Sequence, residues 1–107
     1  MKLFAAISMF VLAGVAQANV ECYCISPRDH YDPNQVAKTC CETTGITYPN
    51  NRNHKGKWSD ERNVCKLKTD GLVFTVDQMQ DSFTACCAQK GPQLPVGLKL
   101  YAGCYAP

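Results

Sequence analysis

Cysteine has the widest chemical range of the residue types in this chain, because it can bind a metal, act as a nucleophile or form a disulfide bond. The chain has eight cysteines: Cys22, Cys24, Cys40, Cys41, Cys65, Cys86, Cys87 and Cys104. Two adjacent pairs lie in the segments TCCETTG (39–45) and ACCAQKG (85–91). Zinc sites usually space paired cysteines as C-x-x-C or add well-placed histidines, whereas these spacings are C-C and C-x-C. We therefore expect no metal site and no cofactor.

The residues at the start of the chain indicate export. The segment MKLFAAISMFVLAGVAQA (1–18) has a positive start, an apolar run and a small-x-small cleavage site, which together are typical of a secretory signal peptide. We expect cleavage after Ala18, which leaves residues 19–107 as a single secreted, extracellular domain. An even number of cysteines in a small exported chain predicts a disulfide framework. The spacing does not select one pairing.

Two groups of polar residues could suggest catalysis. His30 lies between Asp29 and Asp32 in the sequence, as a base beside carboxylates would, and Asp60 and Glu61 resemble a pair of glycosidase acids. No strained serine turn or glycine-rich oxyanion loop accompanies His30, and nothing fixes the separation of the adjacent Asp60 and Glu61. Bridged cysteines lack the free thiolate that nucleophilic catalysis requires. We therefore predict no catalytic residues and no enzymatic activity.

The segment NRNHKGKW (51–58) holds the candidate partner-binding residues. These are Arg52, His54, Lys55, Lys57 and Trp58. Cations beside an exposed aromatic side chain can recognise an acidic partner, a glycan or a phospholipid head group. In the alternative interpretation the segment is a solvated hairpin loop, and the only tryptophan of the chain folds back into the core.

The first cysteine doublet lies at the end of a predicted helix over residues 33–44. Asp32 is a suitable cap, Pro33 suits the first helical position, and Gln35 completes a pattern like a capping box. Gly45 is expected to end the helix in a left-handed conformation.

The second doublet lies in a similar predicted helix. Thr75 and Gln78 form a capping-box pattern at its start, and Gly91 is expected to end it as Gly45 ends the first. The residues that share the spacing of one buried helical face are Met79, Phe83, Cys86 and Cys87.

Four segments have the patterns of strands. They are residues 19–27, 45–49, 64–68 and 98–105. Combined with the helices, they give the order strand–helix–strand twice. We predict an α+β fold, a small two-layer sandwich in which two helices cover one face of a four-stranded antiparallel sheet. Helix-to-strand disulfides are expected to hold the layers together.

The order of these features resembles that of fungal cysteine-rich secreted proteins. The features are the C-x-C strand, the capped helix ending in TCC, Cys65, the SFTACC helix and Cys104. More narrowly, the order is similar to the alpha subunit of the virus-encoded killer toxin of smut fungi and to plant-pathogen effectors with that fold. The resemblance implies a compact two-layer domain. It supplies a scaffold rather than a site, so no functional residue is transferred.

We predict a secreted, non-enzymatic fungal effector that acts in virulence, through surface contacts with a host or microbial target outside the cell. The expected partner is a protein, a glycan or a component of the cell envelope, and the chain is expected to be a monomer. The formal net charge is +2, to which Lys2 of the leader contributes. This near-neutral balance predicts no binding to nucleic acid, and no apolar stretch of the mature chain is long enough to span a bilayer.

Two alternative functions stay open. One is a killer-toxin-like antimicrobial protein that acts on competing fungi. The other is a small protease inhibitor, because a rigid disulfide scaffold can hold an exposed loop in its binding conformation. The loop to test for inhibition is residues 49–57.

Overall fold

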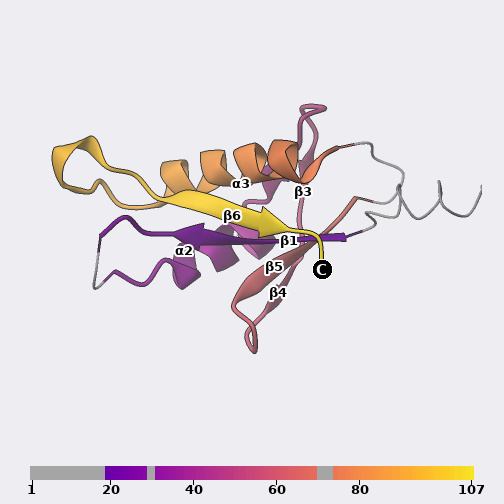
Figure 1. The fold of residues 1–107 in the computed structure, drawn as a ribbon, viewed down its shortest axis with the longest axis horizontal. Coiled ribbons are helices and arrows are strands. Elements are labelled where there is room, and N and C mark those ends of the chain that lie inside the picture. The colour runs from indigo at the N-terminus through magenta and orange to yellow at the C-terminus, as the bar shows by residue number, and fades with distance from the viewer. Residues whose placement is uncertain (1–18, 29–30, 70–73) are drawn as a thin grey trace, which may run out of the picture.

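The computed structural model describes residues 19–28, 31–69 and 74–107, and Figure 1 shows their arrangement. The predicted signal peptide (1–18) and His30 lie outside these ranges. In the described ranges, no helix has the length and apolar character needed to cross a bilayer. The elements are those of a small α+β protein, as predicted.

A four-stranded antiparallel sheet is the central element of the structure, which confirms that part of the prediction. Its strand order is β4–β5–β1–β6, and each neighbouring pair is antiparallel. The strands are β1 (Asn19–Ile25), β4 (Lys57–Ser59), β5 (Val64–Lys68) and β6 (Tyr101–Tyr105). Strand β1 therefore lies between β5 and β6, two strands that come later in the chain.

The strand predicted at residues 45–49 is not part of this sheet. Strand β2 (Ile46–Thr47) instead pairs with β3 (Asn53–His54) in a separate two-stranded sheet. The physical reason is a tight turn: the Asn51 N–H donates to the Tyr48 carbonyl oxygen at 2.8 Å, so the chain reverses directly after β2. Strand β4 takes the free edge of the main sheet, although its residues were expected to lie in a loop.

The first predicted helix is present as two joined segments. The α-helix α2 (Asn34–Lys38) continues into η1 (Thr39–Thr43), which is a π-helical turn. Asp32 Oδ1 accepts a hydrogen bond from the Asn34 N–H at 2.9 Å. The residue at the N-cap is nevertheless Pro33, no side-chain cap hydrogen bond is present, and the predicted capping box with Gln35 is not formed. Gly45 has φ +76°, which confirms the predicted left-handed stop.

The second predicted helix is α3 (Val76–Lys90), and its start is as expected. Thr75 Oγ1 accepts from the Gln78 N–H at 3.1 Å, while Gln78 Oε1 accepts from the Thr75 N–H at 2.9 Å, so the capping box is formed. Gly91 ends the helix as predicted, but the expected left-handed conformation is wrong, because its φ is −78° and its backbone is extended. Glycine is needed there for space: a Cβ would lie 2.7 Å from the Cys87 carbonyl oxygen and 2.8 Å from Leu100 Cδ1.

All eight cysteines form disulfide bonds. The pairs are Cys22–Cys104 between strands, Cys24–Cys87 and Cys41–Cys65 between helix and strand, and Cys40–Cys86 between the two helices. Each doublet thus sends one sulfur to the other helix and one to the sheet.

The two helix-to-strand disulfides attach to the same side of the sheet. Cys22 lies directly opposite Cys65, and residues opposite one another on neighbouring strands share a side. Cys24, two residues along β1, points to that side as well. The bonds Cys24–Cys87 and Cys41–Cys65 therefore hold α3 and η1 against one side. The largest fully buried side chains include Tyr48, Phe83, Ile46, Leu67, Met79 and Leu100.

The edge strand β6 has its outward backbone groups satisfied by α3. The Ala102 N–H donates to Thr84 Oγ1 at 2.9 Å, and the Cys104 N–H donates to Gln80 Oε1 at 2.9 Å. Thr84 and Gln80 are one helical turn apart, which matches the two-residue repeat of the strand. Figure 1 shows α3 running alongside β6.

The opposite edge of the sheet is covered in a similar way by η1. The Trp58 N–H in β4 donates to Glu42 Oε2 at 3.0 Å. Just before β4, the Gly56 N–H donates to the Cys41 carbonyl oxygen at 2.7 Å. Unpaired edge groups can recruit a strand from another chain, and on both edges the helix layer satisfies these backbone N–H groups instead.

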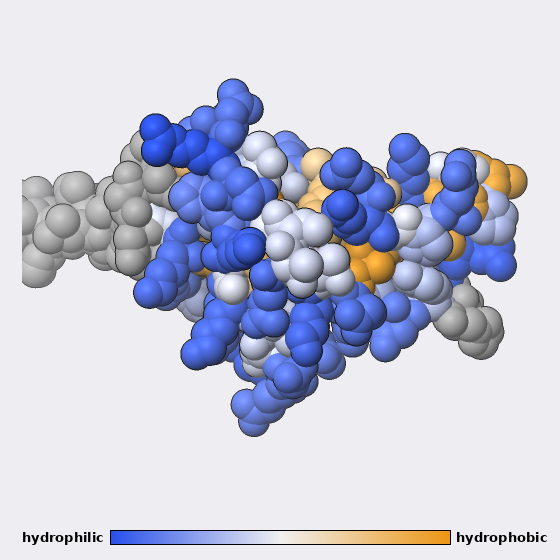
Figure 2. All heavy atoms as spheres, turned by 180° about the vertical axis from the view of Figure 1, so that it is seen from behind, coloured by the Kyte–Doolittle hydropathy of each residue, from blue (hydrophilic) through white to orange (hydrophobic). Residues whose placement is uncertain are grey.

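Hydrophilic side chains cover most of the surface visible in Figure 2. One of the smaller hydrophobic areas lies at the end that carries the loop before β6, seen at the right of that view. In this loop Val96 is 91% exposed and has φ 52°, a conformation that is strained for a β-branched residue.

Replacing Cys40 and Cys86 together by alanine removes the bond between the helices, which closes a separation of 46 residues. We expect the free energy of unfolding to fall by about 2–4 kcal/mol, because the unfolded chain gains freedom. Urea unfolding measures this loss, and the intact mass checks that the other three bridges remain. An unchanged midpoint would contradict the structural role of the bond.

Replacing Thr84 by valine keeps the side-chain shape and removes the acceptor for the Ala102 N–H. We expect a loss of about 1–2 kcal/mol in the free energy of unfolding, because a backbone donor is left unpaired. The matched control is Thr43→Val, at an exposed position. Equal stability of the two variants in thermal unfolding would show that the edge bond contributes nothing.

Candidate binding site on the open sheet face

The side of the four-stranded sheet opposite the cysteines is here called the open face. Alternation along β5 places Lys66 and Lys68 on the open face, because Cys65 and Leu67 point to the helices. Lys57 of β4 and Glu21 of β1 each lie directly opposite Lys66 and share its side. The three lysines are exposed.

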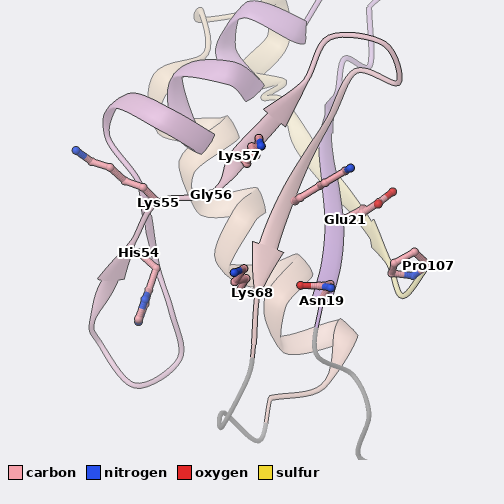
Figure 3. A pocket seen from close by; sticks show the side chains of 9 residues that line it. Asn19, Glu21, His54, Lys55, Gly56, Lys57, Lys68 and Pro107 are labelled. Carbon is pink, nitrogen blue, oxygen red and sulfur yellow. The ribbon is translucent and has the colours of Figure 1, made fainter.

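A cavity of about 500 Å³ lies at this face. It is lined by Asn19, Glu21, His54, Lys55, Gly56, Lys57, Lys66, Lys68 and Pro107. Figure 3 shows that these side chains come from β1, β3, β5, the start of β4, the short segment between β3 and β4, and the C-terminus. The volume is in the range of small-molecule sites.

Gly56 allows the segment before β4 to lie close against β5. A Cβ at this position would be 2.6 Å from the Lys66 carbonyl oxygen and 2.7 Å from Cys65 Sγ. Only glycine avoids these contacts, so the close approach that brings Lys55 and Lys57 beside Lys66 depends on it.

The cavity is positively charged. In the part of the chain that the structure describes, no carboxylate lies within 4 Å of the amino groups of Lys55, Lys57, Lys66 or Lys68. Lys57 and Lys66 also face each other directly across β4 and β5. Like charges in this position repel and destabilise a sheet, and their combined potential attracts an anion.

Glu21 does not neutralise these lysines, because its carboxylate is bound elsewhere. The residue is 4% exposed. Arg62 Nη1 donates to Glu21 Oε2 at 3.0 Å, and the Tyr105 hydroxyl donates to Glu21 Oε1 at 2.6 Å. Arg62 Nη2 also donates to the Tyr105 hydroxyl oxygen at 2.8 Å, which closes a triad. The hydrogen bond to Glu21 raises the pKa of Tyr105, and the charge of Glu21 raises the pKa of Arg62.

Tyr48 supports the cavity wall from the core. It is 2% exposed, its ring centroid lies 4.1 Å from that of His54, and its hydroxyl donates to the Lys68 carbonyl oxygen at 3.2 Å. Burial raises the pKa of Tyr48 to about 12. His54 Nε2 is buried and has no hydrogen-bond partner within the described residues.

The candidate partner-binding residues predicted from the sequence do not all lie at the cavity. His54, Lys55 and Lys57 line the cavity, whereas Arg52 is exposed outside it. Trp58 is only 9% exposed and belongs to the core, which confirms the alternative interpretation of that residue. Alternation explains the result, since Lys57 points outward and its neighbour must point inward.

Sequence reasoning missed the contribution of β1 and β5 to the site. Lys66, Lys68, Asn19 and Glu21 complete the cavity. The segment VCKLK shows that its two lysines share a face, but only the register places Lys57 opposite Lys66. The register is a pairing of two separate segments, so the spacing of residues within either segment does not predict it.

Replacing Tyr48 by phenylalanine removes a phenol whose pKa is raised to about 12. Since an unfolded tyrosine titrates near 10, the protonated phenol contributes stability that is fully present below about pH 10 and lost as the pH rises toward 12. We expect an absorbance titration to show late tyrosinate formation that is smaller by one tyrosine in Tyr48→Phe, while Tyr105, whose pKa is also raised, still titrates late. The control Tyr101→Phe should keep the full late component, and late components of equal size in the two variants would contradict the assignment.

Comparisons with known proteins found no relative of this chain. No family model, curated protein or solved structure matches the chain. The resemblance to fungal killer-toxin subunits and effectors therefore stays a prediction from the order of the cysteines, and the site is interpreted from its own geometry.

Proposed function

We propose that this chain is a secreted, non-enzymatic fungal effector that acts outside the cell by holding a host or microbial target on its open face. Four disulfide bonds are compatible with an oxidising, extracellular environment. Export also rests on the signal-peptide pattern, and the fungal source on the resemblance. The chain acts as a monomer in this proposal.

The observation that carries the proposal is the cluster of lysines at the open face. Lys57 and Lys66 are held directly opposite each other without an acidic partner among the described residues. This arrangement costs stability, and binding of an anionic target would reverse that cost. The lysines project from paired strands, so little backbone order remains to be gained on binding.

We further propose that the fold is a two-layer sandwich with both helices on one face of the sheet. The support is that the bonds Cys24–Cys87 and Cys41–Cys65 reach the same side. In such a sandwich one sheet face is used for stability and the other is left for contacts. The antimicrobial alternative uses the same face on a fungal envelope.

The test is retention of the oxidised protein (residues 19–107) on plant tissue and on intact fungal cells, measured by fluorescence after washing. The triple variant Lys57→Gln, Lys66→Gln and Lys68→Gln should show retained fluorescence that is about tenfold lower, because three attractive charges are removed. Lys99→Gln, an exposed lysine outside the cavity, should behave like the original protein.

Three outcomes would count against this function. Equal retention of the triple variant would remove the open face from the proposal. Turnover of a wall polymer or peptide by the purified protein would contradict the non-enzymatic assignment. Growth arrest of fungal cells, with no retention on plant tissue, would favour the antimicrobial alternative.

A further inference from the structure

The open face has two chemically different halves. The half formed by β4 and β5 carries Lys57, Lys66 and Lys68. The half formed by β1 and β6 carries the aromatic residues Tyr23, Tyr101 and Tyr105, which are exposed or half-buried. Register fixes this placement, because Tyr105 lies opposite Glu21 and Tyr101 lies opposite Ile25.

The lysines are spread along the sheet rather than gathered around one point. Lys66 and Lys68 are two residues apart on β5, which separates them by roughly 6.8 Å of strand. Lys57 is displaced sideways by one strand, or about 5 Å. Because these lysines lie on two strands and along one of them, a chain with one negative charge per repeating unit can contact them in succession.

Tyr23 and Tyr105 are fixed in position by their neighbours, whereas Tyr101 is 45% exposed. The Tyr23 ring lies over Gly103, where a Cβ would be only 2.8 Å from its Cζ. The Tyr105 ring centroid is 6.4 Å from that of Tyr23, and its hydroxyl is held by Glu21 and Arg62. Immobilised rings of this kind offer apolar faces with polar edges, which suit the C–H faces and hydroxyl groups of sugar rings.

The Glu21–Arg62–Tyr105 triad joins the two halves. It neutralises the one carboxylate side chain of the cavity lining and fixes a tyrosine at the boundary. A ligand that crosses from the lysines to the tyrosines therefore meets no unpaired negative charge at Glu21. Covered backbone N–H groups on both sheet edges leave the face, rather than an edge, for the contact.

We propose that the open face binds a linear acidic polysaccharide whose sugars carry carboxylates. The carboxylates pair with Lys57, Lys66 and Lys68, and the sugar rings pack on Tyr23 and Tyr101. A uronic acid polymer has one charge per sugar, so its extended chain offers successive carboxylates to the lysines and sugar rings to the tyrosines. This inference rests on the proposed function and names the ligand class of the same face.

The experiment is calorimetric titration of the oxidised protein (residues 19–107) with polygalacturonate and with its methyl-esterified form. The ester keeps the sugar chain and removes the charge. We expect binding to polygalacturonate that weakens with added salt, and at least tenfold weaker binding to the ester. Sulfated glycan and single-stranded DNA should also bind at least tenfold more weakly, because their charges are spaced differently.

Protein variants test the two halves separately. The triple variant Lys57→Gln, Lys66→Gln and Lys68→Gln should lose at least tenfold in affinity for polygalacturonate, and Lys99→Gln should lose none. Tyr101→Ala, at a residue that is 45% exposed, should lose about threefold to tenfold. Circular dichroism and intact mass establish that each variant is folded and fully oxidised.

The proposal is overturned if the folded protein does not bind polygalacturonate, or if the ester, the sulfated glycan or DNA binds equally well. Unchanged affinity of the triple variant also overturns it. Lysine-dependent retention on cells without binding to polygalacturonate would reject only the ligand class and leave the proposed function standing. If the protein shows neither lysine-dependent retention on cells nor binding to polygalacturonate, both the proposed function and the ligand class are rejected.

Discussion

The structure depends on the way each cysteine doublet is bonded in two directions. Neighbouring helical residues point about 100° apart, so Cys40 reaches Cys86 on the other helix while Cys41 reaches Cys65 in the sheet. Cys87 is bonded to the sheet in the same way. The two sheet cysteines that bind the helices, Cys24 and Cys65, lie on the same side of the sheet, and this side carries buried core residues. The opposite side is then the part of the sheet that can carry a charged surface, because a core would not tolerate unpaired lysines.

The helix layer also controls what the sheet edges can do. Thr84 and Gln80 bind the outward N–H groups of β6, and Glu42 binds that of β4. A partner strand adding at these edges would have to displace these side chains and leave their polar atoms unpaired. The same helices that supply the core therefore discourage strand addition.

The sequence predicts those features that are decided by neighbouring residues. The capping box of Thr75 and the left-handed Gly45 need only a few adjacent positions, so both are found from the pattern. Gly91 follows its cysteine doublet at the same distance as Gly45, but its backbone is extended, and Leu100 from outside the helix leaves no room for a Cβ there. The edge position of β4 and the lysine site are decided by strand register, which depends on contacts between distant segments. The disulfide pairing could not be predicted for the same reason.

Net charge is a poor guide to a site of this kind. The whole chain has a formal net charge of only +2, which argues against general attraction to polyanions. Charges interact within about 8–10 Å at moderate salt, and the backbone positions of Lys57, Lys66 and Lys68 fall within that distance of one another. Glu21 belongs to the same surface, but its carboxylate forms an ion pair with the Arg62 guanidinium. A nearly neutral protein can therefore present a locally basic face.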